Sequence, residues 1–376
     1  MIKDSVAVFD MCSSKISAVI GENGVNGNFV IRSIAEIPCE PFLDGKIEDG
    51  SALTAALTKA FDTVCKTASV KLSKVYVSVS NQFLKSYNRT YEKSYPRRRK
   101  LKRKDVVKYF DEAQEYANLS KKGYEIIDRR PVFFHLDGNR RVEDILGETT
   151  MNVKGYITYF LADVEYTGFV REQFKKLGVS QVCFVPTSIA ESYLLFSSEE
   201  RFSFRILLDV GYITTDLSII YGGGLLYSAA FMTGGGFITA SLCESMNIKY
   251  DLADRLKRRI NLSVPIDTDG IYELNWGEEV YSFSQKKCNS CVRAVLDGIV
   301  EMVDKAILDS RVKLPRDAVI YMTGGGLAYI RGAKEYLFSG IEMPVYVTQP
   351  DLVYMSKPEE SSKIALLNYA LNKRGY

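Results

Sequence analysis

One short pattern occurs twice in this sequence, and the duplication constrains the fold more than any other feature. Val6 to Gly21 reads VAVFDMCSSKISAVIG, and Ile206 to Gly222 reads ILLDVGYITTDLSIIYG. Each copy is an apolar strand that ends in an aspartate, then a polar turn with a pair of hydroxyl residues, then a second strand. Because the same strand-turn-strand pattern occurs twice, the chain is predicted to contain two related lobes.

The size and composition of the chain agree with two packed lobes. At 376 residues it exceeds what a single core usually accommodates, and 46% hydrophobic with 25% charged residues is typical of a globular protein. The formal charge of +3 is nearly balanced, so no nucleic-acid partner is expected. Seven cysteines, an odd number, together with an N-terminus unlike an export signal predict reduced thiols and a cytoplasmic protein.

Histidine and cysteine are not arranged in the sequence as ligands of a zinc-type site. The only histidine, His135, lies in a strand-like stretch and is expected to be structural, and a relay that needs two imidazoles is excluded. Cys288 and Cys291 form a lone CxxC in a helical pattern without a second pair, so thiols on or under a helix are expected rather than zinc ligands. Trp276 is expected to anchor a polar loop.

The stretch from Leu217 to Cys243 has no charged residue and is long enough to cross a membrane. Glycine triplets at 222–224 and 234–236 interrupt it, so strands and turns are predicted instead. The second of these triplets lies in MTGGG at 232–236, and the same five residues recur at 322–326. Both are predicted to join a strand to a helix and to form phosphate-type loops, because glycine permits close approach and a helix N-terminus favours anions.

The segment between the two hairpins, residues 81–160, has a different composition. It contains a basic run from Arg97 to Lys104, in which seven of eight residues are basic, then a helical pattern at 105–117 and several strand-like stretches. We interpret it as an inserted small α+β subdomain. Elsewhere strands and helices alternate, which predicts α/β layers.

Two such hairpins facing each other across a cleft can bind a nucleotide. Turn hydroxyls bind phosphate oxygens, a lysine neutralises their charge, and the two aspartates hold a hydrated Mg²⁺. The residues in these three roles are Ser13, Ser14, Thr214 and Thr215, then Lys15, then Asp10 and Asp209. The simpler interpretation of either hairpin alone is a buried strand with a capped turn, and the recurrence favours the functional one.

The whole pattern resembles the actin, Hsp70 and hexokinase superfamily. The first phosphate loop lies at Asp10 to Lys15, the second at Asp209 to Asp216 and the adenosine loop at Thr323 to Leu327. Within the superfamily the sequence is similar to the FtsA family of bacterial cell-division actin homologues over essentially its whole length. The resemblance implies a two-lobed actin-like ATPase fold in which the insert is the extra, SHS2-like subdomain.

The resemblance also implies the ligands, ATP and Mg²⁺, and the residues that contact them. The stretch DLADRLKRR is similar to the family's Ala-Glu-x-x-Lys ribose contact, with Asp254 in place of the glutamate and Lys257 retained. Asp10 and Asp209 are expected to reach Mg²⁺ through water. The full set of expected cofactor contacts is Asp10, Ser13, Ser14, Lys15, Asp209, Gly211, Thr214, Thr215, Asp254, Lys257, Gly324, Gly325 and Gly326.

Four parts of the chain follow from the same resemblance. They are a first lobe (1–80, 161–190 and 343–376), the insert (81–160), a second lobe (191–240 and 305–342) and a small subdomain of the second lobe (241–304).

The phosphate loops depart from the family pattern at three positions. Cys12, Tyr212 and Ile213 stand where the family has glycine, so side chains enter turns built for bare backbone. Weakened ATP binding is therefore expected. Superfamily ATPases usually place an acidic or amide residue where this chain has Val185, so we expect binding without appreciable hydrolysis.

The resemblance predicts a scaffold whose output is assembly and partner binding. It implies contact between the small subdomain and the C-terminal peptide of the tubulin homologue FtsZ, other divisome partners, self-association into filaments, and a location on the inner face of the membrane at the division site. The last helix resembles a closing core helix, so the candidate membrane contact is Arg97 to Lys104. A solvated loop is the alternative interpretation of that run.

Two other functions stay open. A type IV pilus platform protein related to FtsA has the same fold and insert with a different membrane partner. A superfamily kinase or ATPase needs a polar residue aimed at the transferred phosphate, and none stands at Val185.

Overall fold

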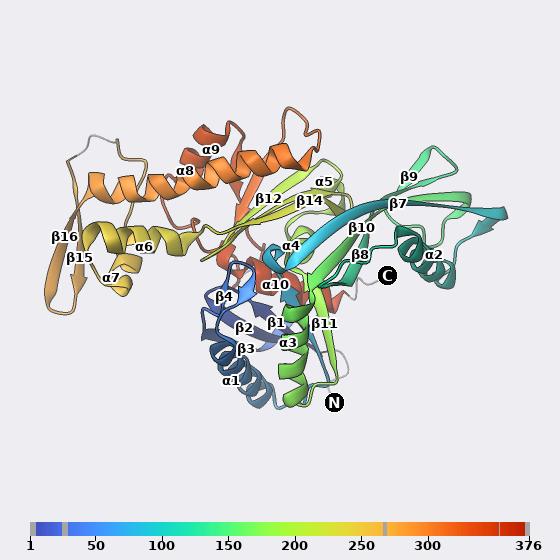
Figure 1. Ribbon diagram of the computed structural model, residues 1–376, viewed down its shortest axis with the longest axis horizontal. Coiled ribbons are helices and arrows are strands. Elements are labelled where there is room, and N and C mark those ends of the chain that lie inside the picture. The colour runs from blue at the N-terminus through green and yellow to red at the C-terminus, as the bar shows by residue number, and fades with distance from the viewer. Residues whose placement is uncertain (1–4, 25–28, 266–268, 353, 373–376) are drawn as a thin grey trace. The chain divides into compact units, whose positions relative to one another are not determined.

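The computed structural model describes residues 5–24, 29–265, 269–352 and 354–372, which form two compact units (Figure 1). Unit 1 comprises Met1–Arg205, Ser218–Ser228 and Ser362–Tyr376, and unit 2 comprises Ile206–Leu217 and Ala229–Ser361. The first hairpin lies in unit 1, and the second hairpin begins in unit 2. The two aspartates that end the first strands therefore belong to different units.

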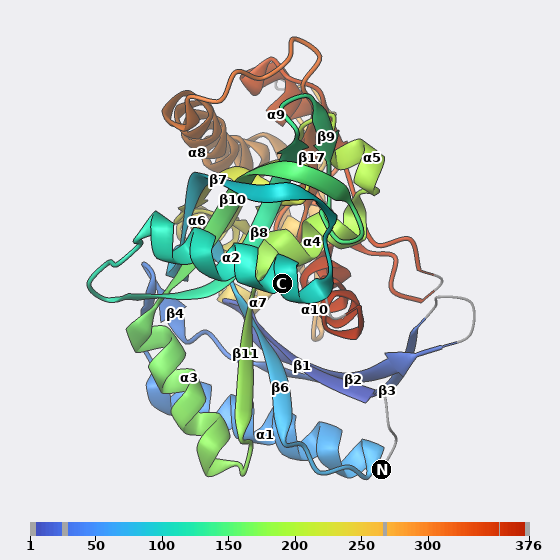
Figure 2. The same ribbon diagram turned by 90° about the vertical axis from the view of Figure 1, so that its right-hand side faces the viewer.

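Unit 1 is built on a five-stranded sheet in the order β11-β6-β1-β2-β3. These strands are β1 (Ser5–Met11), β2 (Lys15–Asn23), β3 (Phe29–Pro38), β6 (Lys74–Val79) and β11 (Gln181–Pro186). β1 pairs antiparallel with β2 and parallel with β6, so the predicted hairpin forms the centre of the sheet. Figure 2 shows α1 (Gly50–Ala68) and α3 (Val164–Lys176) on one face of this sheet and α10 (Ser361–Leu371) on the other. Coverage on both faces explains why β1 and β2 are buried along most of their length.

The inserted segment forms a second sheet in unit 1, in the order β7-β10-β8-β9. Its strands are β7 (Leu84–Lys100), β8 (Tyr124–Leu136), β9 (Arg140–Val142) and β10 (Thr149–Asp163), and α2 (Arg103–Ala117) packs against it. Aromatic side chains fill the core between helix and sheet, with Tyr109, Phe110 and Phe134 fully buried. Gly155 leaves room for them, because a Cβ there would lie 2.5 Å from the Tyr109 hydroxyl oxygen. The segment is thus a small α+β layer pair, as predicted.

The turn between β13 (Thr215–Tyr221) and β14 (Gly224–Phe231) holds this subdomain in place. Gly223 donates its N–H to the Val132 oxygen at 3.0 Å. A Cβ on Gly222, whose φ is +60°, would lie 1.9 Å from the same oxygen. Thr158 of β10 donates to the Leu225 oxygen at 2.9 Å. Glycine is therefore required at 222 for the backbones to meet.

A second five-stranded sheet has the order β14-β13-β12-β17-β18. Residues 218–228 of β13 and β14 are counted in unit 1, and the rest of this sheet and a set of helices are almost entirely in unit 2. The remaining elements are β12 (Arg205–Val210), β17 (Ile320–Thr323), β18 (Val345–Val347), the hairpin β15 (Ile271–Trp276) and β16 (Glu279–Ser284), and helices α6 (Gly235–Met246), α7 (Tyr250–Lys257), α8 (Gln285–Ser310) and α9 (Ala333–Ile341). α6 packs against α7 and α8, and α8 packs against α9. The stretch Leu217 to Cys243 forms strands, a turn and the start of α6, as predicted.

The remaining strands and helices are short. In unit 1 they are β4 (Phe42–Leu43), β5 (Lys46–Ile47), η2 (Asn81–Phe83), α4 (Thr187–Leu195) and α5 (Ser198–Arg201), and in unit 2 η3 (Pro358–Glu360).

One prediction about the glycine triplets is wrong. A helix follows the first triplet directly, since α6 begins at Gly235, but α9 begins only at Ala333, several residues after the second triplet. Gly332 has a φ of +82° and lies tightly against Ser263, so no helix passes through it. The second triplet therefore has no helix N-terminus next to it.

Candidate functional site

The first predicted phosphate loop begins with a buried aspartate. Asp10, at the end of β1, is only 3% exposed. Its Oδ2 atom accepts a hydrogen bond from the Ser362 hydroxyl at 2.5 Å and one from the Cys12 thiol at 3.1 Å. Protein donors thus already bind one carboxylate oxygen of the residue predicted to hold hydrated Mg²⁺.

The only lysine of this loop is bound by a carboxylate. Lys15 Nζ lies 2.7 Å from Glu36 Oε1, and Lys363 Nζ lies 2.5 Å from the same atom. Burial alone raises the pKa of Glu36, but the hydrogen bonds from the two lysines outweigh it and lower the pKa from 4.5 to about 2. Glu36 therefore stays ionised and competes with any phosphate for Lys15.

The turn itself is compact and unstrained. Cys12 donates its N–H to the Lys15 oxygen at 3.1 Å, and the Ser14 oxygen accepts from the Cys39 N–H at 3.1 Å. Ser13 is buried and Ser14 half-buried. Cys12 has no positive φ, so the side chain that replaces the family's glycine costs no backbone strain.

The second predicted loop closes in a similar way within unit 2. Gly211 donates its N–H to the Thr214 oxygen at 2.9 Å, and the Thr215 hydroxyl donates to the Thr233 oxygen at 2.8 Å. Asp209 is half-buried beside the adenosine loop, because a Cβ on Gly324 would lie 2.2 Å from Asp209 Oδ1. The aspartate thus explains the glycine at 324, whose φ is +88°.

The glycine-rich turns of unit 2 are stacked on one another. Gly235 and Gly236 donate their N–H groups to the oxygens of Gly211 at 3.0 Å and Tyr212 at 2.7 Å. A Cβ on Gly326 would lie 2.3 Å from the Gly211 oxygen, and a Cβ on Gly235 would lie 2.8 Å from the Cα of Gly326. These glycines let three turns touch, and the first N–H groups of α6 bind carbonyl oxygens of the chain.

Tyr212 and Ile213 also fit their turn without a positive φ. A Cβ on Gly236 would meet the Tyr212 ring at 3.2 Å, and the Tyr212 hydroxyl is hydrogen-bonded to that of Tyr250 at the start of α7. The bulky residue that replaces a glycine therefore ties the second loop to α7.

The predicted ribose contacts form a bonded cluster on α7. Lys257 is 9% exposed, and its Nζ donates to the Gly235 oxygen at 3.1 Å and to the Thr239 hydroxyl at 2.9 Å. It also lies 2.9 Å from Asp254 Oδ1. Burial raises the pKa of Asp254, but Lys257 and then Arg258 bring it below the usual value. An ammonium group has three donors, so Lys257 must give up one partner to contact a ligand.

Some of the predicted nucleotide contacts are partly exposed, although most of them are already bonded within their own unit. Lys15 has a side chain that is 27% exposed, and Asp254 one that is 29% exposed. Gly325 is the exposed glycine of its triplet. The residue types in each unit fit the contacts of a nucleotide, and a phosphate oxygen would have to displace Glu36 from Lys15.

Val185 lies at the end of β11 and is 2% exposed. The position compared with the water-orienting residue of superfamily ATPases therefore holds a buried apolar side chain. No group of three or more side chains suited to hold a metal ion occurs among the described residues.

Cys288 is fully buried, and burial raises its pKa to about 12. Trp276 stacks on the Arg255 guanidinium at 4.5 Å, and His135 packs against Tyr156 in the insert.

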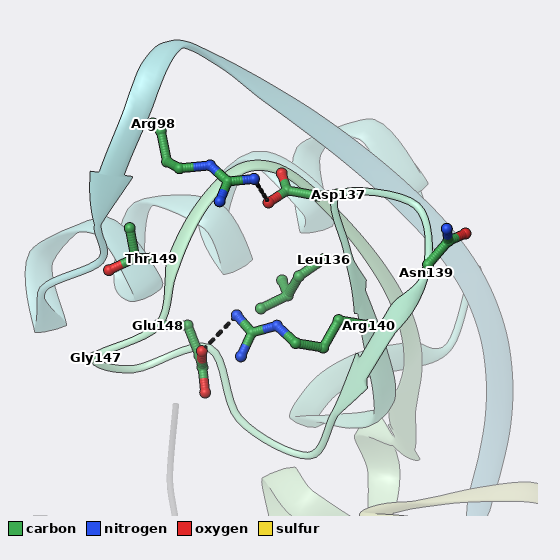
Figure 3. Close-up of a pocket in the computed structure, with 8 residues that line it drawn as sticks. All are labelled: Arg98, Leu136, Asp137, Asn139, Arg140, Gly147, Glu148 and Thr149. Carbon is green, nitrogen blue, oxygen red and sulfur yellow. Dashed lines mark hydrogen bonds and ion pairs between the residues drawn. The ribbon is translucent and has the colours of Figure 1, made fainter.

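A pocket of about 540 Å³ lies in the insert, beside the basic run (Figure 3). Two ion pairs line it, Arg98 with Asp137 at 2.7 Å and Arg140 with Glu148 at 2.6 Å. Backbone N–H groups of Met151 and its neighbour hold Asp137 and lower its pKa to about 2. Because these four charges cancel, the pocket gives no net attraction for an anion.

All seven basic residues of the run Arg97 to Lys104 are exposed. Two of them are paired, Arg98 as above and Arg99 with Asp105 at 2.8 Å. No helix in the described part of the chain has the length and apolar character needed to cross a bilayer.

Sequence reasoning missed the partners of the first loop. Ser362 binds Asp10, Glu36 binds Lys15, and Lys363 binds Glu36 in turn, and no local motif marks any of the three. The only signal was position, since Ser362 and Lys363 open the last predicted helix.

Comparison with curated proteins finds similarity over almost the whole chain to cell division protein FtsA. The Pseudomonas aeruginosa protein is 20% identical over 97% of this chain and 89% of its own length. The Neisseria meningitidis protein is 20% identical over 98% and 91%, and the Escherichia coli protein 18% over 97% and 90%. No protein-family model matches the sequence.

Solved structures with the same fold include a chain of the PilM-PilN type IV pilus biogenesis complex, with a TM-score of 0.64 and 17% identity over 97% of this chain and 98% of that one. MreB5 of Spiroplasma citri bound to ADP gives a TM-score of 0.58 at 13% identity over 99% of both chains. The chain is therefore FtsA-like in sequence and actin-like in fold, which confirms both predictions. The likenesses support a cell-division or related actin-like scaffold.

Proposed function

We propose that this protein is an actin-like scaffold of the FtsA type that binds ATP with Mg²⁺ and works by assembly and partner binding. The observation that carries the proposal is the collinear similarity to FtsA proteins over 97% of the chain. The division of the chain into four parts belongs to the same proposal. Its boundaries follow residues 80, 160, 190, 240, 304 and 342.

ATP binding is proposed through the residues of both loops and of α7. When bound, Mg²⁺ supplies charge neutralisation for the phosphates, with Asp10 and Asp209 reaching it through water. Lys15 exchanges Glu36 for a phosphate oxygen, and this competition makes binding weak. The remaining proposed contacts are Ser13, Ser14, Gly211, Thr214, Thr215, Asp254, Lys257, Gly324, Gly325 and Gly326.

We propose little or no hydrolysis. A water molecule must be oriented in line with the γ-phosphate, and the buried apolar side chain of Val185 cannot do so. Nucleotide occupancy then acts by favouring one conformation of the scaffold over another.

The proposed partners follow from FtsA likeness. They are the FtsZ C-terminal peptide at residues 241–304, other divisome proteins and further copies of this chain. A peripheral contact with the inner face of the membrane at the division site is proposed through Arg97 to Lys104, where each cation near an anionic leaflet contributes about 1 kcal/mol.

A second candidate function is a platform of a type IV pilus machine. The likeness to a chain of the PilM-PilN complex, which covers 98% of that chain, favours it. A kinase or ATPase has no comparable support.

Calorimetric titration with ATP, with and without Mg²⁺, tests the nucleotide part. Weak, Mg²⁺-dependent binding is expected, which Asp209→Asn reduces and Glu36→Gln strengthens because it frees Lys15. The exposed Glu40→Gln is the matched control. Rapid phosphate release, or affinity unaffected by Asp209→Asn, would count against the proposal.

Titration with an FtsZ tail peptide and with a PilN fragment separates the two scaffolds. Binding of the FtsZ peptide alone supports the division role, whereas binding of PilN alone replaces it with the pilus role.

A further inference from the structure

Helix α10 has polar contacts at both of its ends, and the two ends touch different parts of unit 1. At its N-terminus, Ser362 donates to Asp10 Oδ2 at 2.5 Å, and Lys363 lies 2.5 Å from Glu36 Oε1. Glu36 binds Lys15 through the same oxygen. The start of α10 is therefore bonded directly to Asp10 and, through Glu36, to Lys15.

At the other end of the helix, the Tyr369 hydroxyl donates to Asp128 Oδ2 at 2.6 Å. Asp128 belongs to β8 of the insert and also binds Arg130 Nε at 2.9 Å. The Arg130 guanidinium lies over the Tyr369 ring, 4.8 Å from its centroid. Arg130 is 1% exposed, so Tyr369 of the helix contacts a buried ion pair of the insert.

Tight packing along the helix prevents it from yielding locally between these ends. Ile364 and Leu367 are completely buried. A Cβ on Gly21 of β2 would lie 2.8 Å from a Leu367 methyl carbon, so the helix sits directly on the sheet backbone. From Ser362 to Tyr369 the helix rises by about 10 Å. A displacement at one end is therefore transmitted to the other rather than absorbed.

We propose that α10 couples the first phosphate loop to the inserted subdomain. The inference rests on the proposed nucleotide binding and extends it to a route of regulation. When Lys15 binds a phosphate oxygen, Glu36 keeps Lys363 and the Ser17 hydroxyl as its partners. Asp10 then shares its carboxylate between the protein donors Ser362 and Cys12 and the water shell of Mg²⁺. Both changes act on the first turn of α10, and the helix carries them to Asp128.

Tyr369→Phe tests the coupling, because it removes the hydroxyl group that donates a hydrogen bond to Asp128 and keeps the aromatic ring that contacts Arg130. The matched control is Asn368→Ala, next to it on the same helix, whose side chain bonds to Asn372. The first measurement needs no ligand. It is the alkylation rate of Cys12, followed by peptide mass spectrometry with Cys291 of α8 as the internal reference.

Cys12 reports on the far end of the helix, because its sulfur lies 3.9 Å from the Ser362 hydroxyl oxygen. We expect Tyr369→Phe to change the alkylation rate of Cys12 at least about twofold, which is the low end of coupling between residues in contact. Asn368→Ala is expected to leave that rate unchanged. Equal Cys12 rates in the wild type and Tyr369→Phe would overturn the proposal.

The second measurement is hydrogen exchange of β8 and α2 with and without ATP and Mg²⁺, alongside calorimetric binding. In the wild type, ATP is expected to change exchange in the insert, and Tyr369→Phe is expected to bind ATP without that change. Binding without any response in the insert overturns the coupling and leaves the proposed function standing. If no ATP binds, the nucleotide proposal fails, and the Cys12 rates alone decide the coupling.

Discussion

Replacing Glu36 by glutamine tests the electrostatics of the first loop. The ammonium groups of Lys15 and Lys363 both form an ion pair with the Glu36 carboxylate, and the change removes its negative charge. Because the Lys363 side chain is only 3% exposed, its charge cannot be solvated by water instead. The variant is therefore expected to be less stable than the wild type at neutral pH.

The size of the loss follows from the pKa of Glu36. Its fall from 4.5 to about 2 corresponds to about 3 kcal/mol at most. The Glu36 side chain is 36% exposed, so solvent screening reduces this to about 1–2 kcal/mol. Since the folded state lowers the pKa, the stabilisation is complete above pH 4.5 and is lost as the pH falls toward 2.

Urea unfolding followed by circular dichroism measures the effect, with Glu40→Gln as the control. The difference between wild type and Glu36→Gln should be largest at neutral pH and clearly smaller about one unit below 4.5. A difference that is absent at neutral pH, or that does not shrink in acid, refutes the reasoning.

Three further predictions concern packing and thiol reactivity. Gly155→Ala is expected to cost about 1–3 kcal/mol in urea unfolding, because its Cβ would lie 2.5 Å from a buried tyrosine hydroxyl. Gly222→Ala should raise hydrogen exchange in β8, because φ at this position is +60° and the added Cβ would lie 1.9 Å from the Val132 carbonyl oxygen. Gly138→Ala is the control, since its φ is also positive, at +86°, but its Cβ would lie in open space, and it should not change that exchange. Cys288, whose pKa is raised to about 12 by burial, should be alkylated far more slowly at mildly alkaline pH than Cys291.

Much of the fold was predictable because local patterns determine it. The apolar strands before and after the first hydroxyl pair form β1 and β2, and the helical patterns at 105–117 and around Cys288 form α2 and α8. These elements follow from hydrophobic period and turn chemistry, which a single sequence contains. The helix expected directly after Gly326 was wrong because Gly332, with its positive φ, lies in its path.

The bonding of the candidate site was not predictable. Ser362 lies 352 positions from Asp10 and Lys363 lies 327 from Glu36, and no spacing rule connects such pairs. The Tyr212 hydroxyl bonds to that of Tyr250, and nothing in the sequence indicates that contact. Side-chain partners across a fold depend on how elements pack, which sequence period does not specify.

The stacked glycine turns of unit 2 bear on how such sequences evolve. Their glycines are required for contact between backbones, at Gly235, Gly326 and Gly324 alike. Selection for a sound fold alone therefore preserves them, even in a descendant that has ceased to use a nucleotide. A glycine signature of this kind is therefore not evidence of ligand use by itself, and a loss of ligand chemistry would first become visible at charged positions such as Lys15.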